Sequence, residues 1–169
     1  LRLLGPAIRL TQALKESGVS LLLAWPDAGA AALAKRDGPE IADCCVDLNQ
    51  LQRDPAWAGR GDLLLVVGAQ PSDYDTVEAI CSQWFEPVVI LNSRLEDAAV
   101  GIGSVARQRR KGFMSTWQSA FHLEPFLQGA LMQERQQQWE LFRLDPDGYR
   151  WVKQFDARPD QELIDEALT

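Results

Sequence analysis

The sequence has little of what most catalytic and metal sites require. It contains one histidine, His122, and no Gly-x-Ser-x-Gly motif, so nothing indicates a Ser-His-Asp or Cys-His nucleophilic set. Its three cysteines, Cys44, Cys45 and Cys81, are odd in number and lack the spacing of a zinc site or a disulfide framework. We therefore predict reduced core cysteines, a structural or exposed histidine, and neither a metal nor a cofactor.

Long apolar runs and excess positive charge are also missing. No run approaches the roughly 18 apolar residues that span a bilayer, and residues 1–10 lack the layout of a signal peptide. The chain has 17 basic and 24 acidic residues and a net charge of −7, which argues against general binding to a polyanion. We expect a cytosolic, stromal or peripheral protein with no nucleic-acid partner.

Three continuous apolar runs are present, at residues 19–25, 62–68 and 87–92. Runs without polar alternation are typical of strands that are buried on both faces. Helical patterns alternate with them, at residues 6–17, 28–36 and 71–84, and a weaker strand pattern covers residues 42–48. This order predicts a Rossmann-like parallel sheet with right-handed crossovers.

The pattern changes after residue 92. A helix at 104–113 is followed by strand patterns at 116–122 and 127–134, a hairpin at 139–155 with an Asp-Gly turn, and an acidic helix at 159–168. We predict one α/β domain over residues 1–169. In it, a parallel first half is extended by antiparallel strands and a hairpin into a mixed sheet, with helices packed on it.

Polar residues follow each of the three strong strand patterns. They are Asp27 and Gly29, then Gln70 and Ser72, then Asn92 and Arg94. The carboxyl ends of parallel strands meet at one edge, where ligands usually bind, so these residues are candidates for a site. The favoured alternative is that Asp27 and Ser72 cap helices and that Asn92 is a turn residue.

A glycine-rich segment precedes a basic run. Gly101 and Gly103 fit a relaxed dinucleotide pattern, but that pattern must follow its strand directly, and here eight residues intervene. The basic run consists of Arg107, Arg109, Arg110 and Lys111. It is either an anion- or partner-binding segment or, as we favour, a solvated helix face or a pairing surface for the acidic closing helix.

Tryptophan is abundant, and three of the six tryptophans lie in the antiparallel half of the chain. They are Trp117, Trp139 and Trp151. Their default role is in the core, but an exposed aromatic patch on this sheet would indicate a surface for a partner or for a second copy of the chain.

Several motifs together resemble a known family. They are PDAGAAALAKRD at 26–37, DLLLVVGAQP at 62–71, VVILNSRLED at 88–97, VGIGSVARQRRKGF at 100–113 and WELFRLDPDGYRWVKQF at 139–155. In this order they resemble a domain-of-unknown-function family of cyanobacteria and plastids, which includes the low-photosystem-II-accumulation type of chloroplast protein. The matching positions include Asp27, Gly29, Asn92, Gly101, Gly103, Arg107 and Arg110.

The resemblance implies a non-enzymatic accessory role in photosystem II assembly. Such a protein would touch thylakoid membrane-protein subunits or other assembly factors from the cyanobacterial cytoplasm or the plastid stroma, with peripheral membrane contact. The segment from Arg107 to Lys111 would then face an acidic partner loop or anionic lipid. The alternative is a binding protein or enzyme for a phosphorylated small molecule, held by Asp27, Asn92 and the Gly101 loop.

Overall fold

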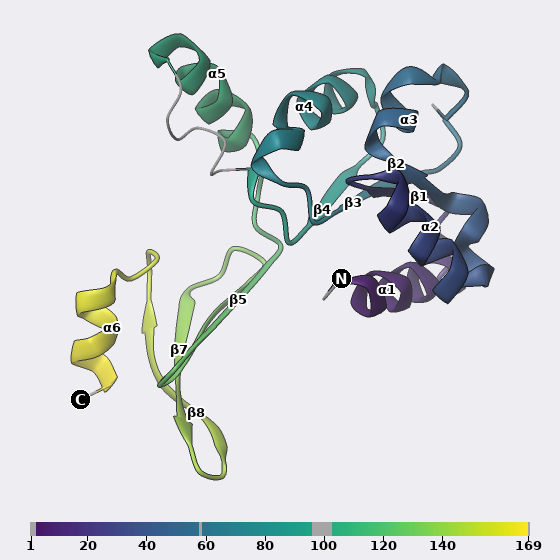
Figure 1. The fold of residues 1–169 in the computed structure, drawn as a ribbon. Coiled ribbons are helices and arrows are strands. Elements are labelled where there is room, and N and C mark those ends of the chain that lie inside the picture. The colour runs from purple at the N-terminus through teal and green to yellow at the C-terminus, as the bar shows by residue number, and fades with distance from the viewer. Residues whose placement is uncertain (1–2, 58, 96–102, 169) are drawn as a thin grey trace. The chain divides into compact units, whose positions relative to one another are not determined.

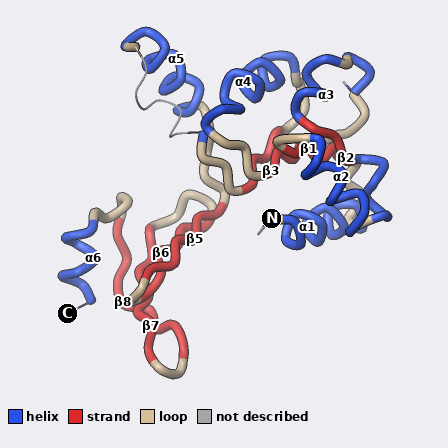
Figure 2. The backbone as a smooth tube through the Cα atoms, in the orientation of Figure 1, coloured by secondary structure: helices blue, strands red, loops and turns tan. Residues whose placement is uncertain are grey.

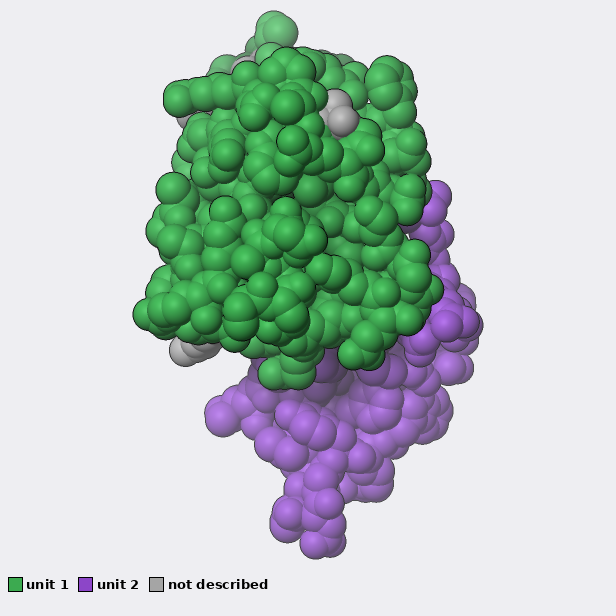
Figure 3. Space-filling view, turned by 90° about the vertical axis from the view of Figure 1, so that its right-hand side faces the viewer, with its two compact units in different colours: residues 1–114 green, residues 115–169 purple. Residues whose placement is uncertain are grey.

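The computed structural model describes residues 3–57, 59–95 and 103–168. The chain divides into two compact units, residues 1–114 and residues 115–169 (Figure 3). None of the described helices is long and apolar enough to cross a membrane.

Residues 1–114 contain a parallel sheet of four strands in the order β2-β1-β3-β4 (Figure 1). The strands are β1 (Leu21–Trp25), β2 (Cys45–Asp47), β3 (Leu63–Val67) and β4 (Val88–Leu91). All five residues of β1 are buried, as are four of the five in β3. The sequence prediction of strands covered on both faces is therefore confirmed for β1 and β3.

Helices cover both faces of this sheet (Figure 2). They are α1 (Leu4–Glu16), α2 (Ala28–Asp37), α3 (Leu48–Arg53) and α4 (Tyr74–Gln83), and α5 (Ser104–Ser115) contacts α4 through the Phe113 and Tyr74 rings. Leu23 of β1 packs in one buried cluster with alanines of α1 and α2. Its neighbour Leu22 packs in a second cluster with Leu48 of α3 and Val77 of α4. Successive strand residues point to opposite faces, so β1 contributes to both halves of the core.

Short 3-10 turns complete this unit, at Pro39–Cys44, Pro55–Trp57 and Pro71–Asp73. The first and last lead into β2 and α4, and each begins with a proline. Proline lacks a backbone N–H and has a fixed φ, so it suits the first position of a helical turn. The weak strand predicted at residues 42–48 is confirmed, but it covers only the three residues of β2.

Residues 115–169 contain an antiparallel sheet in the order β5-β6-β7-β8, followed by α6 (Gln161–Leu168). The strands are β5 (Phe121–Phe126), β6 (Gly129–Glu134), β7 (Trp139–Asp145) and β8 (Gly148–Phe155). The predicted hairpin is confirmed, with Asp145 paired to Gly148 across the turn. Gly148 has a φ of 128°, which side-chain-bearing residues rarely adopt.

The α/β class, the parallel first half and the antiparallel second half are confirmed, but the two halves form separate sheets instead of one extended sheet. Within the described sheets, β4 pairs only with β3, and β5 pairs only with β6. Pro125 lies in β5 and has no backbone N–H to donate to another strand. The antiparallel strands therefore close on each other by hairpins and do not continue the parallel ladder.

Candidate functional site

A cavity of about 360 Å³ lies where β1, β3 and β4 end. Its lining consists of Leu3, Trp25, Pro26, Val67, Gly68, Gln70, Asn92, Ser93 and Arg94. In the strand order β2-β1-β3-β4, β2 is added next to β1 on one side of the sheet, and β4 is added next to β3 on the other side. The direction in which strands are added therefore reverses between β1 and β3. Open α/β sheets bind ligands at such a reversal, beyond the carboxyl ends of the strands. The structure thus brings Gln70, Asn92 and Arg94 together at the edge predicted from sequence.

Two left-handed residues shape this cavity. Gly68 follows β3 with a φ of 62°, and Asn92 follows β4 with a φ of 55°. The Gly68 N–H donates to the Leu91 carbonyl at 2.8 Å, and the Arg94 N–H donates to the Ala69 carbonyl at 2.8 Å. Asparagine tolerates this backbone region better than most residues, so the turn role predicted for Asn92 is confirmed.

Carboxylates cap the helical segments that start near this edge. Asp27 Oδ1 accepts a hydrogen bond from the Ala30 N–H at 2.9 Å, which confirms the predicted cap of α2. The cap predicted at Ser72 is wrong, because Asp73 is the residue that accepts from the Gln70 N–H, at 2.8 Å. Asp27 and Gly29 are absent from the described cavity lining. Because a negative charge already occupies each of these N-terminal ends, the edge does not favour a phosphate.

The basic run lies on α5, and two of its cations pair with acidic residues of α4. Arg109 contacts Asp75 at 2.9 Å and Glu78 at 2.6 Å. Arg110 contacts Asp75 at 3.4 Å and places its guanidinium 4.8 Å from the centre of the Tyr74 ring. Arg109 and Arg110 therefore pair with carboxylates of α4, a helix that the sequence analysis did not name as their partner.

The other described residues of the predicted glycine-rich and basic segments lie on or next to α5. Arg107 and Lys111 are exposed on α5, and Gly103 is exposed immediately before it. Gly101 lies outside the described residues. Among the described residues that line the strand-end cavity, none comes from α5. The predicted anion site, with arginines pointing into the strand-end cavity, is therefore not formed by Arg109 and Arg110.

Tyr74 links α4 to α5 through its ring and its hydroxyl. Its ring packs edge-on against Phe113 at a centroid distance of 5.6 Å, and its hydroxyl donates to the Arg110 carbonyl at 3.3 Å. Burial, with the neighbouring Glu78 carboxylate, raises the pKa of Tyr74 to about 12. The phenol therefore stays protonated and acts as a structural hydrogen-bond donor.

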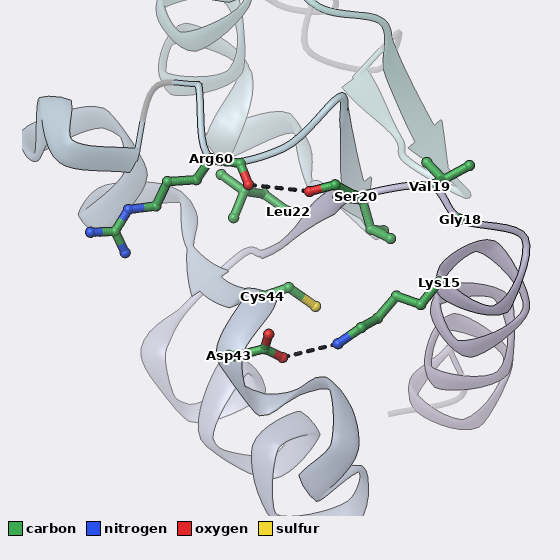
Figure 4. Close-up of a pocket in the computed structure, with 9 residues that line it drawn as sticks. Lys15, Gly18, Val19, Ser20, Leu22, Asp43, Cys44 and Arg60 are labelled. Atoms are coloured by element: carbon green, nitrogen blue, oxygen red, sulfur yellow. Dashed lines mark hydrogen bonds and ion pairs between the residues drawn. The ribbon is translucent and has the colours of Figure 1, made fainter.

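A second cavity, of about 470 Å³, lies at the opposite edge of the parallel sheet (Figure 4). Its lining includes Lys15, Ser20, Asp43, Cys44 and Arg60. The Lys15 ammonium donates to Asp43 at 3.1 Å and to the Glu40 carbonyl at 3.0 Å. Sequence reasoning missed this cavity, because it joins residues from segments far apart in the chain.

The polar groups of this second cavity are poorly suited to nucleophilic chemistry. The hydrogen bond to Asp43 raises the pKa of Lys15, so its amine stays protonated. A hydrogen bond with Cys45 and then burial raise the pKa of Cys44 well above its ordinary value. The Cys44 thiol instead donates to the Ile41 carbonyl at 3.1 Å. Both groups therefore hold local structure.

The single histidine belongs to a polar cluster of the antiparallel unit. His122 Nε2 lies 3.4 Å from Glu124, and its ring packs against Trp139 at a centroid distance of 5.0 Å. Arg158 contacts the same Glu124 carboxylate at 2.6 Å. Burial raises the pKa of Glu124, but the bonds from His122 and Arg158 outweigh burial and lower it. This arrangement supports the structural role predicted for His122.

One face of the antiparallel sheet is apolar and exposed. We call it the apolar face. By strand register its residues share one side, and they are Phe121, Leu123, Pro125, Met132, Phe142, Leu144, Tyr149 and Trp151, with the buried Ala130 among them. Phe121 is 60% exposed, Leu123 55% and Trp151 51%. Contiguous exposed apolar surface is typical of an interaction site.

The other face of this sheet is covered. Leu131 and Leu141 lie opposite each other on it and are 2% and 0% exposed. Arg143, on the same face, donates to the Leu168 carbonyl at 3.4 Å, so α6 lies against this side. Because α6 shields this face, the apolar face is left as the open side of the unit.

In the described part of the chain, there is no group of three or more His, Cys, Asp or Glu side chains that could hold a metal ion. The three cysteines are all unpaired thiols, with Cys44 and Cys45 buried.

A protein-family model described as a domain of unknown function, DUF1995, matches residues 1–166. The chain belongs to the DUF1995 family. No curated protein and no solved structure matches the chain significantly. The membership in a domain-of-unknown-function family that the motifs predicted is confirmed. The DUF1995 match covers nearly all of both units, so the strand-end cavity and the apolar face both belong to the family domain.

The sequence of this DUF1995 chain offered Trp117, Trp139 and Trp151 for an aromatic patch, and of the two in strands Trp151 lies on the apolar face whereas Trp139 lies on the other face. Along β7, Trp139 and Leu141 point to one face of the sheet, and Phe142 and Leu144 point to the other. Both faces therefore look apolar in the sequence. The two faces differ in whether α6 lies against them, and that is decided by contacts between residues far apart in the sequence.

Proposed function

We propose that this protein is a non-enzymatic accessory or assembly factor of photosynthesis, of the photosystem II biogenesis type, that acts by binding other proteins. Its partners would be thylakoid membrane-protein subunits or other assembly factors, reached from the cyanobacterial cytoplasm or the plastid stroma. The photosynthetic context is supported by the motif resemblance. The binding activity is supported by one observation, the exposed apolar face.

The composition of this face suits a protein interface. Phe121, Tyr149 and Trp151 are aromatic and more than half exposed. Large aromatic residues, tryptophan and tyrosine above all, contribute much of the binding free energy at protein interfaces. Covering such side chains removes apolar area from water at about 25 cal/mol per Å². A partner that covers this face would therefore gain affinity from it.

The basic segment of α5 is a weaker candidate for the partner surface. Arg109 and Arg110 already pair with carboxylates of α4. A partner or lipid that recruited these arginines would have to compete with those ion pairs. Peripheral membrane contact through α5 is therefore secondary in this proposal.

The test is capture of detergent-solubilised thylakoid membranes by the immobilised full chain. We expect photosystem II subunits or their assembly factors to be retained by the wild type and lost from a Phe121→Ser/Trp151→Ser variant. The matched control is Phe85→Ser, because Phe85 is 97% exposed but lies outside the apolar face. Equal capture by wild type and the double variant, or retention of no photosynthetic membrane protein, would refute the proposal.

The strand-end cavity supports a second candidate, a binding protein or enzyme for a phosphorylated small molecule. Its position at the reversal of strand order is the usual ligand position of open α/β sheets. The caps Asp27 and Asp73 weigh against a highly charged anion. A thermal-shift screen with nucleotides and sugar phosphates tests it: a ligand-dependent rise in melting temperature that Arg94→Gln abolishes would support it, and no shift would refute it.

A further inference from the structure

We propose that the apolar face binds a basic amphipathic segment of its partner, one that combines apolar side chains with Lys or Arg. This inference rests on the proposed function and specifies the chemistry of the segment that docks. It is carried by how charged residues are divided between the two faces of the antiparallel sheet.

The charged strand residues on the apolar face are carboxylates. Glu134 stands opposite Phe121, and Glu140 stands opposite Met132. Among the described residues of β5 to β8, no Lys or Arg shares this face. The apolar surface is therefore bordered by negative charge alone within its own strands.

The cations of these strands lie on the covered face. Arg143 pairs across the sheet with Arg150, and Lys153 pairs with the buried Leu141. Both arginines contact the single Asp145 carboxylate there, Arg143 at 3.3 Å and Arg150 at 2.6 Å. Arg143, Arg150 and Lys153 therefore project from the face opposite the one that carries Glu134 and Glu140.

One cation lies near the border of the apolar face. Arg135 follows β6 and contacts Glu134 at 3.5 Å, but its side chain is 82% exposed. Ion pairs this exposed are screened by water and salt and contribute little. Arg135 therefore leaves the electrostatic preference of the face largely unchanged.

The antiparallel unit as a whole also carries a net negative charge. Residues 115–169 contain ten acidic and five basic residues, a formal charge of −5. A negatively charged surface attracts cationic partners and speeds their association. A second copy would bring Glu134 and Glu140 against like charges, and an anionic bilayer would be repelled. The charge thus selects a cationic protein segment over these two occupants.

Membrane proteins carry an excess of Lys and Arg in their cytoplasmic loops, next to apolar spans. A loop or amphipathic helix of that kind offers both features that the apolar face complements. Apolar contact would supply the affinity, and the two carboxylates would orient the segment and exclude acidic competitors.

The experiment is a selection of phage-displayed random 16-residue peptides on the immobilised full chain. Peptides that also bind the Phe121→Ser/Trp151→Ser variant are discarded, and Phe85→Ser serves as the matched surface control. We expect the face-dependent peptides to be apolar and to carry more Lys and Arg than Asp and Glu. For a synthetic copy of one such peptide, Glu134→Gln/Glu140→Gln should raise the Kd about fivefold to tenfold, since each interfacial charge contact typically changes affinity by a factor of a few.

Three outcomes would overturn the inference. They are face-dependent peptides that are neutral or acidic, no face-dependent peptides at all, and vesicles of phosphatidylglycerol that sediment the wild type but not the double face variant. The inference and the proposed function fail separately. Thylakoid proteins captured through the face, combined with acidic selected peptides, would sink only the charge preference, whereas cationic peptides without photosynthetic captures would sink only the photosynthetic role.

Discussion

Asp27 shows how one side chain defines the start of an element. Its carboxylate accepts the Ala30 N–H at the first turn of α2, a helix rich in alanine with Lys35 and Arg36 in its last turn. An acid at the start and cations at the end both favour the helix dipole. The cap was predictable from the sequence, because it depends only on residues three positions apart.

Removing this cap should destabilise the protein. We expect Asp27→Ala to lower the free energy of unfolding by about 1 kcal/mol, since an N–H at the helix start loses its partner. Asp27→Ser keeps an acceptor oxygen and should stay within a few tenths of a kcal/mol of the wild type. Urea unfolding of the three proteins measures the difference. Equal losses for both variants would show that the cap is not the cause.

Glu124 should give the antiparallel unit a pH-dependent stability at acid pH. The bonds from His122 and Arg158 lower the pKa of Glu124 in the folded state below the ordinary 4.5. A lowered folded-state pKa means that the contribution is complete above about pH 4.5 and is lost as the pH falls through the folded-state value.

The measurement is the difference in unfolding free energy between wild type and Glu124→Gln across pH 3 to 7. We expect the variant to be less stable at neutral pH and the gap to close below pH 4.5. Glu166→Gln, at an exposed site on α6, is the control. A gap that stays constant down to pH 3 would contradict the assigned interaction.

At the scale of elements, the pairing of α5 with α4 connects residues more than thirty positions apart. Arg109 reaches two carboxylates of α4, whereas Lys111 is exposed on the same helix. The cluster of cations was evident from the sequence, but the only pairing predicted for it was with the acidic closing helix. Which acids face a helix is decided by packing, and here the Tyr74 and Phe113 rings bring α4 and α5 together.

This pairing predicts unequal effects of two charge-removing substitutions. Arg109→Gln should cost about 0.5 to 1 kcal/mol at low salt, because it breaks two exposed ion pairs, and Lys111→Gln should cost close to nothing. Raising the salt concentration should shrink the Arg109 effect. Thermal unfolding at low and high salt tests this. A Lys111→Gln loss as large as that of Arg109→Gln would contradict the contacts described.

At the scale of the whole molecule, the two units bury their apolar residues differently. The parallel sheet of residues 1–114 is covered by helices on both faces, and its two buried clusters include most of the core. The antiparallel sheet buries one face and exposes the other. Apolar residues of the second unit therefore contribute to the core on one face and, in our proposal, to partner binding on the other.

Substitutions on the two faces should separate these roles. Leu141→Ala removes a fully buried side chain and should cost about 3 kcal/mol of unfolding free energy. Trp151→Ser changes a half-exposed residue and should cost under about 1 kcal/mol, yet it should abolish partner capture. Denaturant titration and capture are measured on the same samples. A large loss of stability from Trp151→Ser would mean that the apolar face is core.

The sequence by itself determined the elements whose signals are local. The apolar runs of β1 and β3, the Asp27 cap, the turn at Asn92 and the Asp-Gly hairpin were all predictable. Each depends on residues that are neighbours in the chain, where periodicity, capping and φ preferences act directly. The α/β class followed from their order.

Tertiary structure decided everything that depends on distant contacts. It separated the two sheets, assigned the α5 arginines to α4, formed the cavities and left the face with Trp151 uncovered. Alternation along a strand specifies two faces but not which one a helix will cover. That choice arises only in the folded unit, where Arg143 contacts the Leu168 carbonyl of α6 on the face that buries Leu131 and Leu141, because burial is a property of the folded chain and not of any one segment.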